Sequence, residues 1–117
     1  MYEIHSRKAD GKEIDQMPIM EISIVPLGTR TPSVSDYVAV CLKKIKNKKN
    51  IHYTLTSMGT VIEANSTSRL LKIADEMHHA VLQGKIKRVV TTIKIDDRID
   101  KKLTIKGKLD TVQKKIK

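Results

Sequence analysis

The order in which two kinds of apolar pattern alternate along the chain is the feature that most constrains its fold. Strands repeat apolar side chains every second residue, whereas helices repeat them every three or four residues. These patterns predict, in chain order, a strand at 18–26, a helix from about Ser33 to Ile45, strands at 51–57 and 60–64 joined by a turn at Met58-Gly59, a helix that begins within 65–68 and stops before Gly84, and a strand at 88–96.

The order β-α-β-β-α-β predicts a ferredoxin-like α+β sandwich, with one four-stranded antiparallel sheet and two helices on one of its faces. We expect the first and fourth strands to form the central pair and 60–64 to form an edge. Alternation along 88–96 then divides the side chains between the faces. Val89, Thr91, Ile93 and Ile95 are predicted to face the helices, and Val90, Thr92, Lys94 and Asp96 to lie on the open face.

Two segments flank this pattern. Residues 1–18 are polar and lack periodicity, so they are predicted to be a flexible extension to a domain at 19–117. After Asp96 the chain is charged, and apolar residues spaced for a strand end and a short last helix follow, namely Leu103, Ile105, Leu109, Val112 and Ile116. No stretch is long and apolar enough to span a membrane and the first residues do not resemble a signal peptide, so a cytoplasmic location is expected.

Composition limits the core and the chemistry. The chain has no Trp or Phe, so the core must consist of aliphatic side chains and Met. Cys41 is its single cysteine and lies in an apolar helical stretch, which favours a small buried hydrophobe over a nucleophile. The net charge of +10 invites anionic partners, including nucleic acid.

The start of the first predicted helix has a capping pattern. Ser33-Val-Ser-Asp36 places a hydroxyl three residues before an acid, so Ser33 or Ser35 is predicted to cap this helix. The preceding loop offers free backbone N–H groups, hydroxyls and Arg30, a combination that suits an anion or a polar heterocycle. Ordinary capping and ligand binding are both compatible with this pattern.

Several ordered segments resemble one protein family. They are Ile24–Thr29, Ser33–Ser35 with Tyr37–Ala39, Met58–Thr60 with Ile62-Glu63, and Thr92–Arg98 with Asp100-Lys101. Together they are similar to the signature segments of the small thiamine-binding proteins, over about residues 19–113. This resemblance implies a non-catalytic, ferredoxin-like subunit that assembles into dimers or tetramers and binds thiamine or its hydroxymethylpyrimidine part, without a further cofactor. Ala64 departs from the glycine that the family often has after the glutamate.

The resemblance and the residues together give a set of candidate ligand contacts. Glu63 is the candidate carboxylate for the thiazolium cation, with a solvent-facing hairpin charge as the alternative. Tyr53 could stack on a pyrimidine, although packing is the usual role of a tyrosine. The full set is Gly28, Thr29, Ser33, Ser35, Tyr53, Thr60, Glu63, Lys94 and Asp96.

Other functions receive less support from the residues. An RNA-recognition domain needs aromatic residues on its central strands, and the strands expected there have none. Asp96 and Asp97 are adjacent and point to opposite faces of a strand, so a salt-bridge cluster with Arg98 and Lys101 is favoured over a metal site. No residues have the spacing of a catalytic set. The open face, half apolar and without aromatic residues, predicts association with further copies of the chain.

Overall fold

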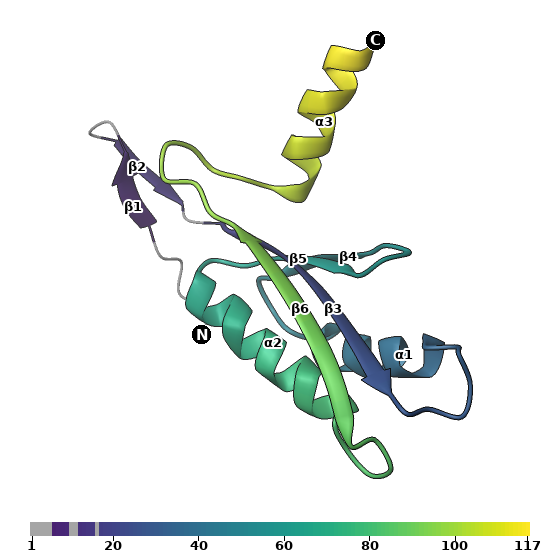
Figure 1. Cartoon of the computed structure of the whole chain (residues 1–117). Helices are drawn as coiled ribbons and strands as arrows, with labels where there is room; N and C mark the ends of the chain where they lie inside the picture. The colour runs from purple at the N-terminus through teal and green to yellow at the C-terminus, as the bar shows by residue number, and fades with distance from the viewer. Residues whose placement is uncertain (1–5, 10–11, 16) are drawn as a thin grey trace.

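The computed structural model describes residues 6–9, 12–15 and 17–117. Within these residues the chain forms a sheet with helices on one side, preceded by a hairpin and followed by a last helix (Figure 1). The elements are β1 (Ser6–Ala9), β2 (Lys12–Asp15), β3 (Ile19–Leu27), α1 (Ser35–Ile45), β4 (His52–Leu55), β5 (Thr60–Glu63), α2 (Thr67–Val81), β6 (Arg88–Asp96) and α3 (Ile105–Ile116). From β3 to β6 the order is β-α-β-β-α-β, so the predicted ferredoxin-like α+β fold is confirmed.

The strand order of the main sheet is β4-β5-β3-β6, with every neighbouring pair antiparallel. β3 pairs with β6 over all nine residues and with β5 over Ile19–Ile22. The central strands are therefore β3 and β5. The predictions that the first and last domain strands form the central pair, and that 60–64 is an edge, are wrong. Each helical connection steps over one strand, which leaves β6 and β4 as the two edges.

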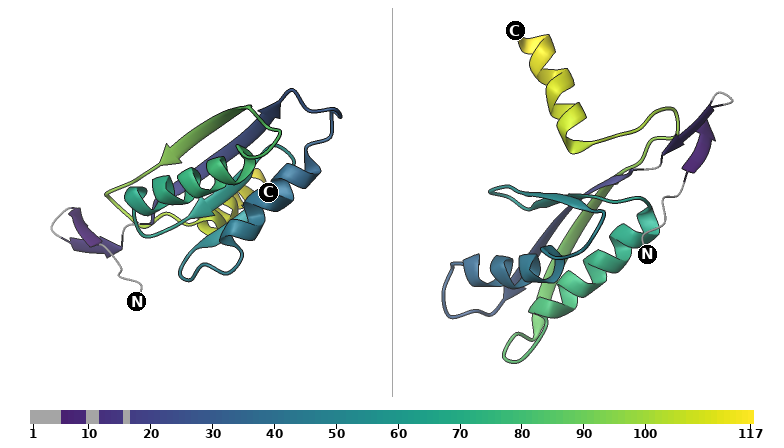
Figure 2. Two further views of the ribbon diagram at one scale, coloured as in Figure 1. Left: turned by 90° about the horizontal axis from the view of Figure 1, so that it is seen from below. Right: turned by 180° about the vertical axis from the view of Figure 1, so that it is seen from behind.

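The two domain helices, α1 and α2, lie side by side against one face of the sheet (Figure 2). The core lies in this layer and consists of aliphatic side chains and methionine, as the composition requires. Its largest fully buried aliphatic and methionine side chains are Met20, Ile22, Ile45, Ile62, Leu70, Ile73 and Met77. Burial of such a side chain contributes about 1.5–3 kcal/mol relative to leaving it in water, so this layer supplies most of the stability.

The boundaries of α2 follow the sequence signals. The Oγ of Ser66, which lies within the predicted start at 65–68, accepts a hydrogen bond from the backbone N–H of Arg69 at 3.1 Å. Gly84, just beyond the helix, has φ +59°, a conformation that glycine adopts without strain. His78 Nδ1 lies 2.6 Å from Thr91 Oγ1, so Thr91 faces the helices as the alternation of β6 predicts.

The last helix lies on the opposite side of the sheet and projects from it (Figures 1 and 2). Leu103, just before it, is buried, but none of the twelve residues of α3, all of them described, is buried. Leu109, Val112 and Ile116 are all more than half exposed. Neither α3 nor any other helix in the described part of the chain combines the length and apolar character needed to cross a membrane.

The segment before the domain has more structure than the sequence pattern predicted. Ser6–Ala9 pairs antiparallel with Lys12–Asp15, with Ala9 opposite Lys12. Residues 1–18 therefore include a β-hairpin, where only a loose extension was expected. Apolar periodicity does not detect this pairing, because residues 6–9 and 12–15 are mostly polar. The remaining residues of this segment, 1–5, 10–11 and 16, lie outside the described part, and flexibility stays a prediction.

Candidate ligand-binding site

A groove of about 530 Å³ lies on the helix side of the sheet, between α1, β3 and the tip of the β4–β5 hairpin. We call it the helix–hairpin groove. Its lining side chains are apolar or carry hydroxyl, thiol or thioether groups, and none of the described lining residues is charged. They are Ile22–Val25, Val34, Ser35, Val38, Ala39, Cys41, Leu42, Leu55–Thr60 and Met77.

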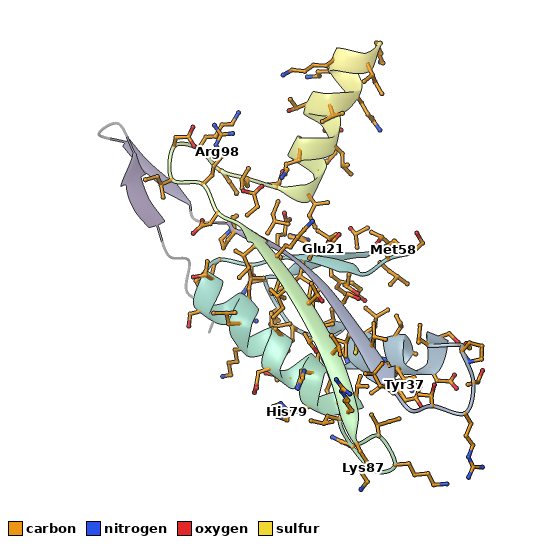
Figure 3. All side chains as sticks on the ribbon, viewed as in Figure 1. Glu21, Tyr37, Met58, His79, Lys87 and Arg98 are labelled. Atoms are coloured by element: carbon orange, nitrogen blue, oxygen red, sulfur yellow. The ribbon has the colours of Figure 1, made fainter. Side chains whose placement is uncertain are left out.

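The hairpin side of this groove is fixed by one threonine. Thr56 Oγ1 donates to the carbonyl of Gly59 at 2.9 Å and accepts hydrogen bonds from the N–H groups of Met58 and Gly59. The Thr56 N–H also donates to the Gly59 carbonyl, at 2.8 Å. These bonds satisfy the polar groups of the turn locally. Met58, whose side chain is 81% exposed, is thereby held at the hairpin tip (Figure 3).

Gly59 allows the hairpin to approach β3. A Cβ atom at this position would lie 2.9 Å from the carbonyl oxygen of Ile22, closer than real Cβ atoms come to backbone. A larger residue would therefore push the hairpin away from β3 and widen the groove. The Met58-Gly59-Thr60 segment thus has a geometric role in shaping the site.

Helix α1, which forms one side of the groove, begins differently from what the capping pattern predicted. The N-cap of α1 is Val34, with no side-chain capping bond among the described residues, and Ser35 is the first helical residue. The prediction that Ser33 or Ser35 caps this helix is therefore wrong. The two hydroxyls lie 3.2 Å apart and bond to each other, which takes the Ser33 side chain away from the helix N–H groups. Ser35 remains at the rim of the groove.

The loop before α1 holds itself together through short-range bonds. Thr29 Oγ1 donates to the carbonyl of Thr31 at 2.6 Å, and Thr31 Oγ1 accepts from the N–H of Ser33 at 3.2 Å. Gly28, at φ +79°, turns the chain out of β3. Neither described groove is lined by Gly28, Thr29 or Ser33. These residues position the start of α1 and Ser35.

Cys41 lies in the floor of the groove and is 5% exposed. Its thiol contacts the carbonyl oxygen of Met77 at an S···O distance of 3.7 Å. Burial raises the pKa of the Cys41 thiol to about 11, because the thiolate would lose its hydration. The burial of this side chain confirms the prediction that Cys41 is a small buried residue of the core.

A second groove, of about 690 Å³, lies on the open face between the sheet and the first turns of α3. We call it the sheet-face groove. It contains charged side chains of both signs: Lys94 Nζ lies 3.8 Å from Glu21 Oε1, and Lys108 Nζ lies 2.5 Å from Asp96 Oδ2. Its lining residues are Ile19, Glu21, Thr54, Thr56, Val61, Lys94, Ile95, Asp96, Ile105, Lys108 and Leu109.

Glu63, the candidate carboxylate, lies in neither groove. It is 6% exposed, and its Oε2 accepts a hydrogen bond from the backbone N–H of Ile105 at 2.8 Å. Thr104 Oγ1 accepts from the N–H of Gly107 at the same helix end. A carboxylate suits this position because the first N–H groups of a helix lack partners and carry partial positive charge. In the described structure Glu63 anchors α3, and contact with a ligand stays a prediction.

Two ion pairs link residues of the expected charge cluster to partners outside it. Arg98 donates two hydrogen bonds to Asp100, and Asp96 pairs with Lys108 of α3. The hydrogen bond from Arg98 lowers the pKa of the Asp100 carboxyl below its usual value. Among the described residues no group of three or more His, Cys, Asp and Glu side chains is placed to bind a metal ion.

The predicted contact residues therefore separate into two places. Ser35 and Thr60 line the helix–hairpin groove, whereas Lys94 and Asp96 line the sheet-face groove. Tyr53 lies on the edge strand β4, 38% exposed, and lines neither. Thr56, Met58 and Ala39 line the helix–hairpin groove but were not among the predicted contacts, although the last two lie within the segments that carry the family resemblance. The turn residues Thr56 to Gly59 could have been found from their hairpin position.

Comparisons with known proteins cover nearly the whole domain. The family described as "Thiamine-binding protein" matches residues 20–113. A UPF0045 protein of Methanothermobacter thermautotrophicus is 41% identical over 96 residues, which cover 82% of this chain and 96% of that protein. The UPF0045 protein YqgV of Bacillus subtilis is 43% identical over 101 residues, which cover 84% and 96%.

Solved structures agree with the fold. A hypothetical protein of Methanocaldococcus jannaschii has a TM-score of 0.75 at 37% identity, over 83% of this chain and 96% of that one. A Thermotoga maritima protein, whose description proposes a role in thiamine biosynthesis or salvage, has a TM-score of 0.69 at 19% identity, over 82% and 98%; this likeness concerns the fold. Sequence match, relatives and fold agree, and the chain belongs to the thiamine-binding protein family.

Proposed function

We propose that this chain is a non-catalytic small-molecule binding protein that holds thiamine, or its hydroxymethylpyrimidine part, in the helix–hairpin groove. One observation carries the proposal. Three segments that resemble the family and are separate in sequence, 24–29, 33–39 and 58–60, all contribute residues to this groove. Family membership supports binding of a small molecule of this class.

The chemistry of the groove suits the pyrimidine end of thiamine. An aminopyrimidine is flat, aromatic and uncharged, and it presents a ring nitrogen and an amino group to hydrogen-bonding partners. The groove offers apolar walls from Val34, Val38 and Ile24, with the hydroxyl of Ser35 at its rim. Small-molecule sites commonly combine such apolar walls with a few polar groups that fix the orientation of the ligand. The charged thiazolium would then lie toward solvent.

The test uses two neighbouring residues of α1. Ala39 lines the groove and Val40 does not, and both are exposed. Isothermal titration with hydroxymethylpyrimidine and thiamine should give binding to the wild type. Ala39→Phe should weaken it at least about tenfold by filling the groove, equivalent to about 1.4 kcal/mol, while Val40→Phe leaves it unchanged.

Two results would contradict this placement. If neither compound binds the wild type, the proposed class of ligand is wrong. If Ala39→Phe binds as well as the wild type, the ligand does not lie in the helix–hairpin groove. Glu63→Gln provides a further comparison, since a charged hydrogen-bonded ligand contact is worth about 1.5–3 kcal/mol. If Glu63→Gln abolishes binding while Ala39→Phe does not, the ligand lies near α3 instead.

We also propose that the chain associates with further copies of itself as a dimer or tetramer. Leu109, Val112 and Ile116 form an exposed apolar stripe on α3, and β6 presents a nine-residue edge strand. Exposed apolar patches and unpaired strand edges are common interaction surfaces. Light scattering at micromolar concentration should give a multiple of the 13.2 kDa chain mass. Leu109→Ser with Val112→Ser should lower that mass, and a monomer in the wild type would contradict association.

A further inference from the structure

The sheet-face groove shares only Thr56 with the lining of the helix–hairpin groove and has different chemistry. Its floor is the open face of β3, β5 and β6, where Ile19 and Val61 supply apolar surface. Leu109 of α3 closes its other side. Figure 3 shows Glu21 on the side of the sheet that faces α3. A molecule that enters this groove therefore meets apolar walls and charges together.

The charges of the groove form two pairs of opposite sign. The Glu21–Lys94 pair is loose, because 3.8 Å is longer than a hydrogen bond. The Lys94 side chain is 77% exposed and that of Glu21 48%, and an exposed pair of this kind contributes little to stability. Each partner keeps hydrogen-bonding capacity, so a ligand can separate them at small cost.

The second pair lies at a fixed distance from the first. Lys94 and Asp96 are alternate residues of β6, so they share a face of the sheet with their Cα atoms about 7 Å apart. In the register, Lys94 lies opposite Glu21 and Asp96 lies opposite Ile19. Asp96 pairs with Lys108 across the groove. The groove thus has a negative and a positive group at each of two points.

We propose that the sheet-face groove is a second binding site, and that it takes a zwitterionic small molecule with an apolar body. The cation of the ligand would contact a carboxylate at one point, and its anion an ammonium group at the other. The four side chains sum to zero charge, so a bound zwitterion keeps the net charge of the groove at zero. A ligand with one charge makes only one of these two charged contacts, which weakens its binding.

The test uses 6-aminohexanoate, a zwitterion whose charges stand about 7 Å apart, the spacing estimated for alternate strand residues. Titration of the full chain, followed by NMR of its backbone amides, should shift signals of β6 and of the start of α3. Hexanoate, hexylammonium and glycine are the comparison compounds. Each lacks one charge or the spacing, and each should bind about tenfold more weakly.

Single-residue variants test whether 6-aminohexanoate binds in the sheet-face groove. Lys94→Met and Glu21→Gln should each weaken 6-aminohexanoate binding about tenfold, because each removes one charged contact. Lys106→Met is the matched control, since Lys106 lies on α3 with an 89% exposed side chain and does not line the groove. Binding by Lys106→Met should equal that of the wild type.

Three results would overturn the proposal: no binding of 6-aminohexanoate, equal binding of hexanoate, or equal losses in Lys94→Met and Lys106→Met. The outcome does not depend on the thiamine proposal. Ala39→Phe fills the other groove and should leave 6-aminohexanoate binding unchanged. Loss of this binding in a correctly folded Ala39→Phe variant would place the zwitterion in the helix–hairpin groove and contradict a second site.

Discussion

The two faces of the sheet carry grooves of comparable volume and contrasting chemistry, about 530 Å³ on the helix side and about 690 Å³ on the open side. The helix–hairpin groove has no charged side chain among its described lining residues, whereas the sheet-face groove has four. The same strand builds both: β3 gives Ile22 and Ile24 to one, and Ile19 and Glu21 to the other. Because neighbouring strand residues point to opposite faces, one strand can line two grooves of different chemistry.

The largest expected effect compares neighbours on β5. Ile62 is fully buried on the helix side, and Val61 is partly exposed in the sheet-face groove. Ile62→Ala should lower the free energy of unfolding by about 2–5 kcal/mol, because it leaves a cavity in the core. Val61→Ala should lower it by about 1 kcal/mol. Urea unfolding measures both, and equal losses would mean that the open face is as well covered in solution as the helix side.

A smaller effect is expected where β5 meets α3. Glu63→Gln replaces the carboxylate that accepts from Ile105 by a weaker, neutral acceptor, at a cost of about 1–2 kcal/mol. Hydrogen exchange should accelerate in α3 and remain unchanged in α2. Glu76→Gln is the control, because Glu76 pairs with Lys48 at the surface. Unchanged protection in α3 would show that Glu63 does not hold this helix.

Titration of the Cys41 thiol tests whether water reaches the floor of the helix–hairpin groove. Its folded pKa, about 11, lies above the ordinary cysteine value of 9.0, so its contribution to stability is present below pH 9 and is lost as pH rises toward 11. Between pH 7 and 10 the wild type should lose about 1.4 kcal/mol more than Cys41→Ala, since one pKa unit corresponds to that amount. Equal losses in the two proteins would mean that water reaches the floor of the groove.

The smallest effect on stability is expected from removing a serine hydroxyl at the start of α1 or of α2. Ser66→Ala removes a side-chain cap and should cost about 1 kcal/mol, whereas Ser35→Ala removes none and should change stability by a few tenths of that. Thermal unfolding of the two variants gives the comparison. A loss of stability for Ser35→Ala as large as that for Ser66→Ala would mean that Ser35 does cap α1, as the capping pattern predicted.

The sequence predicted the elements of the domain well because their apolar periodicity is strong. β6 was predicted with its observed bounds, and the β4–β5 hairpin and α3 were found where expected. Strand order was not predictable from this periodicity, since it depends on which connections step over a strand. The cap of α1 was predicted wrongly because Ser33 and Ser35 bond to each other, a tertiary detail that a capping pattern does not contain.

The candidate site was predictable in part. Ser35 and Thr60 line the helix–hairpin groove, but Glu63, the candidate carboxylate, contacts α3. The sequence distance from Glu63 to Ile105 hides this contact, because no local pattern links a hairpin strand to a helix 42 residues later. Glu21 was not among the candidates, as its position opposite Lys94 follows from strand register.

The bond between Glu63 and Ile105 also has a consequence for the order of folding. The carboxylate becomes positioned only when β5 lies beside β3, which requires most of the sheet to be formed. α3 also lacks a buried residue of its own, and a twelve-residue helix is marginal in isolation. During synthesis this segment leaves the ribosome after the sheet strands. We therefore expect α3 to form late, on a sheet already assembled.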